Sequence, residues 1–376
     1  MIWTVVILLS LVSLMTVYSS TGSLAYRFHG GNTTYFLIKQ LIFLGLGLSI
    51  VFITHLISYK VYYPLSTILL GISVPLLLIT LVFGATLNQA SRWLEVPGLG
   101  ITFQTSDVAK LALIMYVSKI LSQKQKDIKD LRQGFVPLVI PIGLICMLIL
   151  PANFSTAALL GLACWIMMFV GRVNLKYLLG FTGLGIILLG AFIVIALQLK
   201  NVGRVHTWMN RIENFASGDN GDGNYQVEQS KIAIATGGII GKGPGRSTQR
   251  NFLPHPYSDF IFAIIVEEYG LLGGAIILAL YLILLFRSAL IVKNAKRTFP
   301  AFLAFGLALL MALQALVNMM VAVNLIPVTG QPLPLVSMGG TSLFFSSAAF
   351  GIILSISRSQ SKTELFDGEE PVEDNN

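Results

Sequence analysis

We expect an all-α polytopic membrane protein with about ten transmembrane helices and a large extracytoplasmic loop between the seventh and eighth helices. Of the 376 residues, 55% are hydrophobic and only 11% are charged. The mean hydropathy is +0.78. Soluble globular domains carry about 25% charged residues, so this composition excludes an ordinary soluble domain. Apolar runs of close to ~20 residues, enough to cross a hydrocarbon core of ~30 Å, recur along the chain.

The apolar runs, taken in order, define the expected spans. The first run starts at Ile2, with no cation before Arg27, so it lacks the basic region of a cleaved signal peptide and is expected to be a membrane helix. The fourth to sixth runs fall short of ~20 residues and need a tilt or help from their flanks. The expected spans are Ile2–Tyr18, Tyr35–Ile57, Tyr62–Phe83, Val108–Leu121, Phe135–Leu150, Thr156–Val170, Tyr177–Leu199, Phe260–Phe286, Phe299–Val323 and Leu343–Ser357.

The distribution of Lys and Arg predicts the orientation of these spans. Successive loops lie on alternate sides of the membrane. Most cations outside the long loop then fall on one side, and the short loops on the other side hold only Arg27, Lys39 and Arg92. The positive-inside rule then places both termini in the cytoplasm and residues 200–258 outside. The long loop has seven cations of its own, and an anionic ligand is one reason for them. The net charge of +8 therefore reflects topology and gives no indication of nucleic-acid binding.

The stretch from Gly237 to Gly270 is the only place where glycines, cations, carboxylates and a long apolar run meet. Its first half interleaves five glycines with Lys242, Arg246 and Arg250, which suits a backbone that bends around an anion such as pyrophosphate. It is not a Walker A loop, because Gly243 follows Lys242 where Ser or Thr is required. A plain flexible loop fits the same residues equally well.

The second half predicts an apolar helix that runs to about Phe286, with Ser258 as its N-cap and Asp259 in its first turn. At ~1.5 Å per residue such a helix exceeds the bilayer core, so Asp259 would stand at the headgroup boundary. Glu267 and Glu268 would lie two to three turns deeper. A carboxylate favoured by the helix dipole accounts for Asp259 as well as a functional role does.

Other stretches are expected to border the same outer site. Asn88–Lys110 is predicted to be an outer loop that turns at Pro97 and Gly98, with Trp93 near the membrane interface. Lys110 lies one turn inside the following helix, spaced to pair with Asp107 or to face an interior cavity. The proline- and glycine-rich stretch 324–342 predicts irregular backbone beside the membrane.

Two helices are expected in the long outer loop, and a tail at the end of the chain. Residues 204–215 have Val205, Trp208 and Ile212 on one face, as in a helix that lies on a membrane surface. Residues 225–240 predict a second helix that glycines terminate. Both helices could simply cap the bundle. Residues 1–362 form the expected membrane domain, and residues 363–376 form an acidic tail expected to be disordered and cytoplasmic.

Metal and redox chemistry find little support in the sequence. Cys146 and Cys164 both lie in apolar runs and are expected to be core residues. The four histidines show no metal-ligand spacing with each other or with the cysteines, so no zinc site is predicted. No cofactor is certain, and a divalent cation stays open.

Several separated motifs together resemble the SEDS family of bacterial cell-wall proteins, whose members include FtsW, RodA and SpoVE. Arg92-Trp93 and the segment TFQTSDVAK resemble the family's RW and F-x-QPSE-x-x-K motifs, with Thr105 for the proline and Asp107 for the glutamate. Asn153 stands where many members have an aspartate, so no role is carried onto it. The runs GKGPGRSTQ and LPHPYSDFIFAIIVEEYG match closely, and LPLVSMGGTS matches the motif that contains Ser337.

The resemblance implies a ten-helix peptidoglycan glycosyltransferase of the bacterial cytoplasmic (inner) membrane that polymerises lipid II with inversion and expels undecaprenyl pyrophosphate. It implies a class B penicillin-binding transpeptidase and other divisome proteins as partners, with the division branch favoured over elongation. Asp259 matches the family's essential aspartate and is the candidate base. The candidate substrate-binding residues are Arg92, Trp93, Lys110, Arg211, Lys242, Arg246, Arg250, Glu267, Glu268 and Ser337. A flippase for the lipid-linked precursor and a scaffold that only recruits the transpeptidase are the alternatives.

Overall fold

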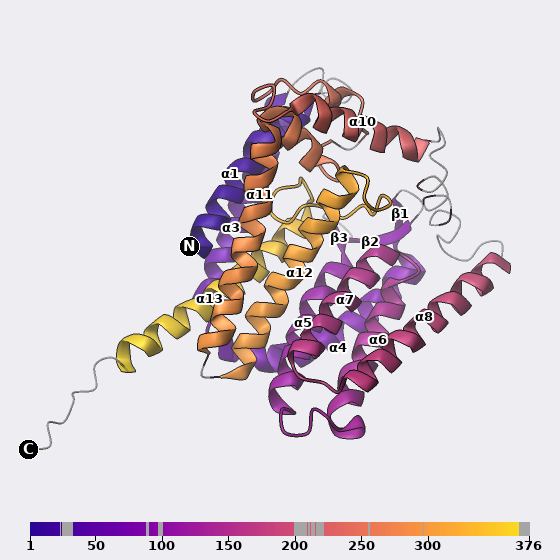
Figure 1. The fold of residues 1–376 in the computed structure, drawn as a ribbon, viewed down its shortest axis with the longest axis vertical. Coiled ribbons are helices and arrows are strands. Elements are labelled where there is room, and N and C mark those ends of the chain that lie inside the picture. The colour runs from indigo at the N-terminus through magenta and orange to yellow at the C-terminus, as the bar shows by residue number, and fades with distance from the viewer. Residues whose placement is uncertain are drawn as a thin grey trace, which may run out of the picture.

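The fold is a bundle of long helices, seen in a computed structural model that describes residues 1–22, 24, 33–87, 90–96, 101–198, 209, 211, 215, 222–254, 256–295 and 297–367 (Figure 1). Each of the ten expected apolar runs is found as a helix. These helices are α1 (Ile2–Ser20), α3 (Thr33–Leu56), α4 (Tyr59–Phe83), α5 (Thr105–Gln123), α6 (Val136–Ile149), α7 (Phe154–Val170), α8 (Leu175–Gln198), α11 (Ile261–Asn294), α12 (Thr298–Ala322) and α13 (Thr341–Asp367).

The predicted fold class, a polytopic all-α membrane protein, is confirmed. Seven helices among the described residues are long and apolar enough to cross a bilayer, and α7 and the first part of α8 are shorter apolar helices. The exact number of crossings stays a prediction. Because α13 continues to Asp367, only residues 368–376 of the expected acidic tail lie outside the described residues.

Helix α12 lies at the centre of the bundle. It packs against α11, α5, α13 and α7, and most of its side chains are buried. At the periphery, α13 packs against α3, and α4 packs against α5. Helix α8 stands apart on one side of the bundle in Figure 1, with contacts to α7. Its exposed Leu, Ile and Val side chains are those expected of a helix that faces lipid.

A small sheet replaces the outer loop that the sequence predicts between α4 and α5. Strands β1 (Ala85–Leu87), β2 (Ala90–Val96) and β3 (Ile101–Gln104) form an antiparallel sheet in the order β1-β2-β3. Trp93 lies opposite Gln104 in the β2–β3 register. Pairing the strands satisfies backbone groups that an irregular loop at the membrane edge would leave to water.

The long loop between α8 and α11 is described in part. The predicted surface helix at 204–215 lies outside the described residues except for Met209, Arg211 and Phe215. The second predicted helix is present as α10 (Asp222–Gly237), which covers the upper end of the bundle in Figure 1. It ends where the next residue, Gly238, adopts a φ of 58°. The glycine terminator that the sequence indicates is therefore confirmed.

The helix predicted to start at Ser258 is wrong in two respects. Helix α11 starts at Ile261, with Phe260 as its N-cap, so Asp259 precedes the helix and does not occupy its first turn. The helix is also interrupted at Gly270, where φ is 71° and ψ is −175°. At this break Lys242 and Gly243 donate backbone hydrogen bonds to Glu267 and Glu268, and Leu271 donates one to Gly238. Tertiary pairing therefore overrides the local helix signal.

Candidate functional site

Asp259 lies in a short turn that two other segments, α12 and the stretch before α13, hold in place. The carbonyl oxygen of Asp259 accepts a 2.9 Å hydrogen bond from Asn318 Nδ2 of α12. The carbonyl oxygen of Ser258 accepts a 2.7 Å hydrogen bond from the Ser337 hydroxyl. One residue earlier, the Tyr257 carbonyl accepts from the Met338 backbone N–H at 2.9 Å. The turn is thus fixed through its backbone, which leaves the Asp259 side chain free to act.

The Asp259 carboxylate is partly exposed and lies beside a bend of the stretch 324–340. Its Oδ1 atom accepts a 3.0 Å hydrogen bond from the Ser258 hydroxyl. Its Oδ2 atom would lie 3.6 Å from a Cβ added at Gly330, whose φ is 67°. A glycine at 330 therefore keeps the space beside Oδ2 open, as a base that receives a proton requires.

Arg211, in the long loop between α8 and α11, lies close enough to this carboxylate for the two charges to interact. Its Nη1 atom donates a 2.8 Å hydrogen bond to the Val328 carbonyl, two residues before Gly330. Burial lowers the pKa of Arg211, and the charge of Asp259 opposes that shift. Burial raises the pKa of Tyr257, and the negative charge of Asp259 raises it further. The fold thus brings Asp259 and Arg211, both predicted site residues, within electrostatic range of each other.

Two polar side chains of α12 connect this helix to the irregular stretch beside Asp259. Gln314 and Asn318 are four residues apart and face the same side of the helix. Gln314 donates to the Pro332 carbonyl at 2.9 Å, and Asn318 donates to the Gln331 carbonyl at 2.8 Å. Gln331 in turn donates to the Thr156 hydroxyl of α7 at 2.7 Å. The irregular stretch predicted near the C-terminus is thereby anchored on two helices.

Lys110 and Asp107 form an ion pair inside the bundle, with 2.7 Å between Lys110 Nζ and Asp107 Oδ1. Both residues also line a small cavity of about 30 Å³, together with Gln314, Ser342 and Ser346. Both interpretations of Lys110, a local pair and a cavity-facing cation, therefore describe it correctly. Gln314 lies one helical turn, ~6 Å along the axis, below the Asn318 that holds Asp259. The ion pair and Asp259 consequently share one side of α12.

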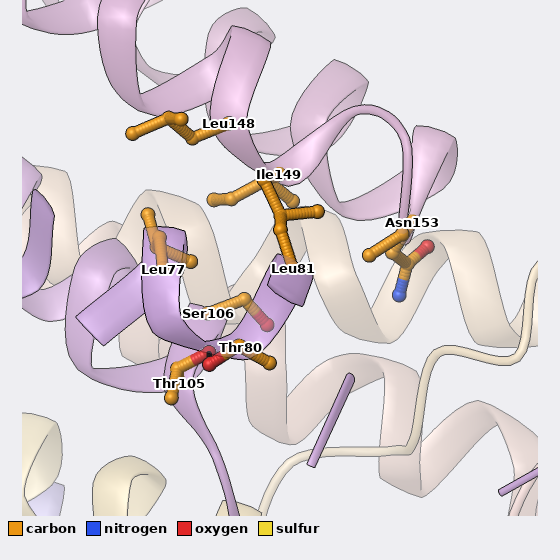
Figure 2. Close-up of a pocket in the computed structure, with 9 residues that line it drawn as sticks. Leu77, Thr80, Leu81, Thr105, Ser106, Leu148, Ile149 and Asn153 are labelled. Atoms are coloured by element: carbon orange, nitrogen blue, oxygen red, sulfur yellow. Dashed lines mark hydrogen bonds between the residues drawn. The ribbon is translucent and has the colours of Figure 1, made fainter. Parts of the chain in front are cut away.

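A second small cavity, of about 20 Å³, lies between α4, the start of α5 and the α6–α7 turn (Figure 2). The Thr80 hydroxyl donates to the Thr105 hydroxyl at 2.9 Å on one wall, and Leu77, Leu81 and Ile149 form apolar walls. Asn153 lies at its edge and caps α7 by accepting a 3.3 Å hydrogen bond from the Thr156 N–H. The cavity is mostly apolar and has no ionisable residue in its lining.

The glycine-rich loop is docked on the break in α11. Glu267 is fully buried and forms an ion pair with Lys242, with 2.6 Å between Lys242 Nζ and Glu267 Oε1. It also accepts hydrogen bonds from the Ser247 and Thr248 hydroxyls. Glu268 accepts hydrogen bonds from the Ser19 hydroxyl of α1 and from the Ser247 N–H. A Cβ at Gly237, Gly241 or Gly270 would come within 2.3 Å of a backbone oxygen of the partner segment. The glycines thus serve close packing between backbones as well as tight bends.

The cations of this loop differ in their availability. Lys242 is paired with Glu267, and Arg250 donates to the Ser19 carbonyl at 2.8 Å. Arg246 is exposed on the surface of the loop. Of these three predicted phosphate-binding residues, Arg246 is the one that the described contacts leave open to a ligand.

The remaining predicted site residues take positions at the border of the site. Ser337 is buried, accepts a 2.8 Å hydrogen bond from the Leu333 N–H and donates to Ser258, so it positions the Asp259 turn. Trp93 is partly buried in β2. The backbone of Arg92 lies in the same strand, and its side chain lies outside the described part of the chain.

Sequence reasoning missed Gln314, Asn318 and Gln331. Two amides spaced four residues apart in an otherwise apolar helix were a usable signal, because polar groups inside a membrane protein need partners. The described residues contain no group of three or more His, Cys, Asp or Glu side chains that could hold a metal ion.

Comparison with known proteins places this geometry in context. Residues 1–362 match the FTSW_RODA_SPOVE family model, described as cell cycle protein. The stage V sporulation protein E of Bacillus subtilis (strain 168) is 34% identical over 361 residues, covering 94% of this chain and 95% of that protein. A probable peptidoglycan glycosyltransferase FtsW of Geobacter sulfurreducens is 34% identical over 365 residues, covering 94% of each protein.

Solved structures share the fold. A chain from a structure on the coordination of polymerization and crosslinking by a peptidoglycan synthase complex superposes with a TM-score of 0.70 at 24% identity, covering 95% of this chain and 98% of that one. The rod shape determining protein RodA of Thermus thermophilus superposes with a TM-score of 0.64 at 26% identity, covering 94% of this chain and 96% of that one.

Proposed function

The chain belongs to the FtsW, RodA and SpoVE family of cell cycle proteins, and from that premise we propose that it is a peptidoglycan glycosyltransferase that polymerises lipid II. The observation that carries the proposal is the Asp259 carboxylate, anchored through its backbone by Asn318 and partly exposed beside Gly330. A catalytic base requires a fixed position and an accessible oxygen, and Asp259 has both.

The site would face the outside of the cytoplasmic membrane. The positive-inside distribution of Lys and Arg supports cytoplasmic termini and an extracytoplasmic position for the loop that carries α10. In Figure 1, α10 and the end of the bundle that carries the glycine-rich loop lie opposite the end from which α13 leaves. Asp259 would then meet the sugar of a substrate whose polyprenyl tail lies in the membrane.

The proposed reaction is a single displacement at the anomeric carbon of the donor. A hydroxyl oxygen of the acceptor sugar bonds to that carbon while the bond between the carbon and the pyrophosphate oxygen breaks. The hydroxyl proton passes to the Asp259 carboxylate, and the electron pair leaves with undecaprenyl pyrophosphate. One displacement inverts the α-linked donor to a β-linked product. A well-placed base typically accelerates such a step by ~10² to 10⁴.

Positive charge near the leaving group would stabilise the departing pyrophosphate. Arg211, beside Asp259, and the exposed Arg246 are the best placed candidates. Lys110 could add a cation from within the bundle. Lys242 and Arg250 are held by Glu267 and Ser19, so their first contribution is to the shape of the loop.

A flippase would use the same polar cavity to move the precursor across the membrane. The cavity beside Lys110 has about 30 Å³, room for one or two water molecules and far too little for a sugar. A flippase would therefore require a second conformation in which this cavity opens, whereas the proposed base is accessible in the present one. The recruiting scaffold needs no exposed carboxylate at all.

We assign the protein to cell division in preference to elongation, with a class B penicillin-binding transpeptidase as partner. The support is that the chain is 34% identical to an FtsW and to the sporulation protein SpoVE, against 26% identical to the RodA of solved structure. An elongation polymerase is the second candidate.

The test is polymerisation of labelled lipid II by the purified protein together with its transpeptidase, with products resolved by size. We expect glycan ladders from the wild type and none from a folded Asp259→Asn variant. The matched control is Glu228→Gln on α10, an exposed carboxylate at the same end of the bundle, which should give wild-type ladders. Equal ladders from Asp259→Asn would exclude Asp259 as base, and transfer of intact lipid II between leaflets without ladders would favour the flippase.

A further inference from the structure

An open groove lies at the end of the bundle remote from Asp259. The first turn of α4, the last turn of α5 and the start of α12 enclose about 480 Å³ there. Pockets that bind small molecules typically span about 300 to 1,000 Å³. The two cavities described above are more than ten times smaller. This groove therefore has room for a ligand, and no step of the proposed reaction uses it.

The groove and the proposed catalytic site lie on opposite faces of the membrane. Thr298 lines the groove, and Asn318, which holds Asp259, lies on the same helix 20 positions further on. At ~1.5 Å per residue these two positions are ~30 Å apart, the thickness of the hydrocarbon core. The groove therefore stands at the headgroup level of the leaflet that does not face Asp259.

The walls of the groove are fixed by contacts between the three helices. The Tyr63 ring packs edge-on against Phe299, with 5.0 Å between ring centroids. Lys119 Nζ lies 4.8 Å from the centroid of the Tyr63 ring, and Gln123 donates to the Tyr63 hydroxyl. The Ser122 and Thr298 hydroxyls share a 2.7 Å hydrogen bond. A preformed pocket loses little conformational entropy when a ligand enters.

The charge of the groove is positive and uncompensated. Lys60 and Arg297 line it from α4 and from the residue before α12, and both are exposed. None of the residues that line the groove is acidic. Within the described part of the chain, neither cation forms an ion pair. Two exposed cations beside aromatic and hydroxyl walls attract a phosphate more strongly than either would alone.

We propose that this groove binds the phosphate headgroup of an anionic phospholipid. A lipid is favoured over a soluble phosphate because the groove stands at headgroup level and one of its walls, α4, exposes apolar side chains such as Val61 and Ile68 on an adjacent face of the helix, where acyl chains would lie. Basic pockets between transmembrane helices are known to take acidic lipid headgroups. The bound lipid would cross-link α4, α5 and α12 at the face opposite the catalytic site.

The test uses the full chain in detergent, titrated with phosphatidylglycerol and with zwitterionic phosphatidylcholine, with bound lipid counted by native mass spectrometry. Phosphatidylglycerol should bind at least tenfold more tightly than phosphatidylcholine. In the double variant Lys60→Gln/Arg297→Gln, affinity for phosphatidylglycerol should fall about thirtyfold, or ~2 kcal/mol at ~1.4 kcal/mol per tenfold. The charge-preserving pair Lys60→Arg/Arg297→Lys should retain wild-type affinity.

The matched control is Lys126→Gln/Arg132→Gln, which removes two exposed cations outside the groove. Affinity of this control should stay within twofold of the wild type. An equal loss in control and groove variants, or no loss in either, would overturn the site. Glycerol 3-phosphate is the soluble arm of the test: displacement of phosphatidylglycerol at equal affinity would overturn the assignment to a lipid.

Discussion

Asn318 Nδ2 donates to two backbone carbonyls at once, that of Asp259 at 2.9 Å and that of Gln331 at 2.8 Å. One buried amide of α12 thereby joins the turn before α11 to the irregular stretch before α13. The carboxylate of Asp259 is left outside this network except for its hydrogen bond from Ser258. Asn318 is thus a positioning residue for the proposed base.

Replacing Asn318 should therefore reduce both stability and catalysis. In Asn318→Ala two buried carbonyls lose their donor, at ~1 to 3 kcal/mol each if water cannot replace it. We expect lipid II polymerisation to fall ~10- to 100-fold in a protein that still folds, since a shift of ~1 Å can cost 10²-fold. The measurements are polymerisation rate and apparent melting temperature.

A control with the same chemistry lies at the other end of the bundle. Gln360 donates its side-chain amide to the Ile291 carbonyl at 3.0 Å. Gln360→Ala should lower the melting temperature slightly and leave the polymerisation rate unchanged. If both variants lost activity in proportion to stability, Asn318 would have only a structural role.

Gly270 should tolerate no side chain. Its φ of 71° is strained for other residues, and an added Cβ would lie 2.1 Å from the Ile239 carbonyl oxygen. Gly270→Ala should therefore undock the glycine-rich loop and cost more than ~3 kcal/mol, seen as a large loss of melting temperature or of folded protein. Gly71→Ala on α4, with nothing within 4 Å of the added Cβ, should be neutral or stabilising by up to ~1 kcal/mol. Equal melting temperatures for the two variants would contradict the packing described at Gly270.

The particular residues show how far sequence alone reaches. The apolar runs predicted ten helices of the bundle, because a helix that crosses a membrane needs a run of ~20 mostly apolar residues and such a run is visible in the local sequence. The break at Gly270 was not predictable in the same way. A single glycine in an apolar run is usually tolerated in a helix. The break is favourable here because the backbone of residues 238–243 forms hydrogen bonds with the backbone on both sides of Gly270.

The site shows the same limit. Asp259 and Arg211 are both predicted site residues, and the fold brings their charges within electrostatic range of each other. The sequence could not separate Lys242 from Arg246, because the pairing of Lys242 depends on Glu267 on a different segment. Asn318 and Gln314 donate hydrogen bonds to the backbone carbonyls of residues 331 and 332. Those partners lie in a different segment, so no local sequence pattern predicts the pairing.

Glu267 should matter for stability through the glycine-rich loop. Its carboxylate is fully buried and receives Lys242, Ser247 and Thr248. Removing the cation of a buried pair leaves an uncompensated buried charge and typically costs ~3 to 5 kcal/mol, so Lys242→Met should melt well below the wild type. Glu267→Gln should lose less, because the partly exposed Lys242 ammonium can be solvated and the amide oxygen of Gln can still accept from Ser247 and Thr248. Lys231→Met, on the exposed face of α10, is the control for loss of a positive charge. If this control melted at as low a temperature as Lys242→Met, a specific contribution of the Lys242–Glu267 pair would be refuted.

Lys110 offers a test that separates a structural ion pair from a cation that contacts substrate. The pair with Asp107 joins two buried residues three positions apart on α5. Lys110→Met leaves the Asp107 carboxylate buried without its cation, so both melting temperature and polymerisation should fall. That single variant alone cannot separate the two roles.

The exchange Asp107→Lys/Lys110→Asp separates them. It keeps an i,i+3 pair, so the melting temperature should recover most of the loss, less the ~0.3 to 1 kcal/mol that a cation in the first turn of a helix costs. The cation now stands about one turn earlier on α5, so polymerisation should stay at the level of Lys110→Met if Lys110 meets an anionic group of the substrate. Recovery of both stability and polymerisation in the exchanged variant would show that the pair acts only on the fold, because the position of the positive charge would then not matter to the reaction.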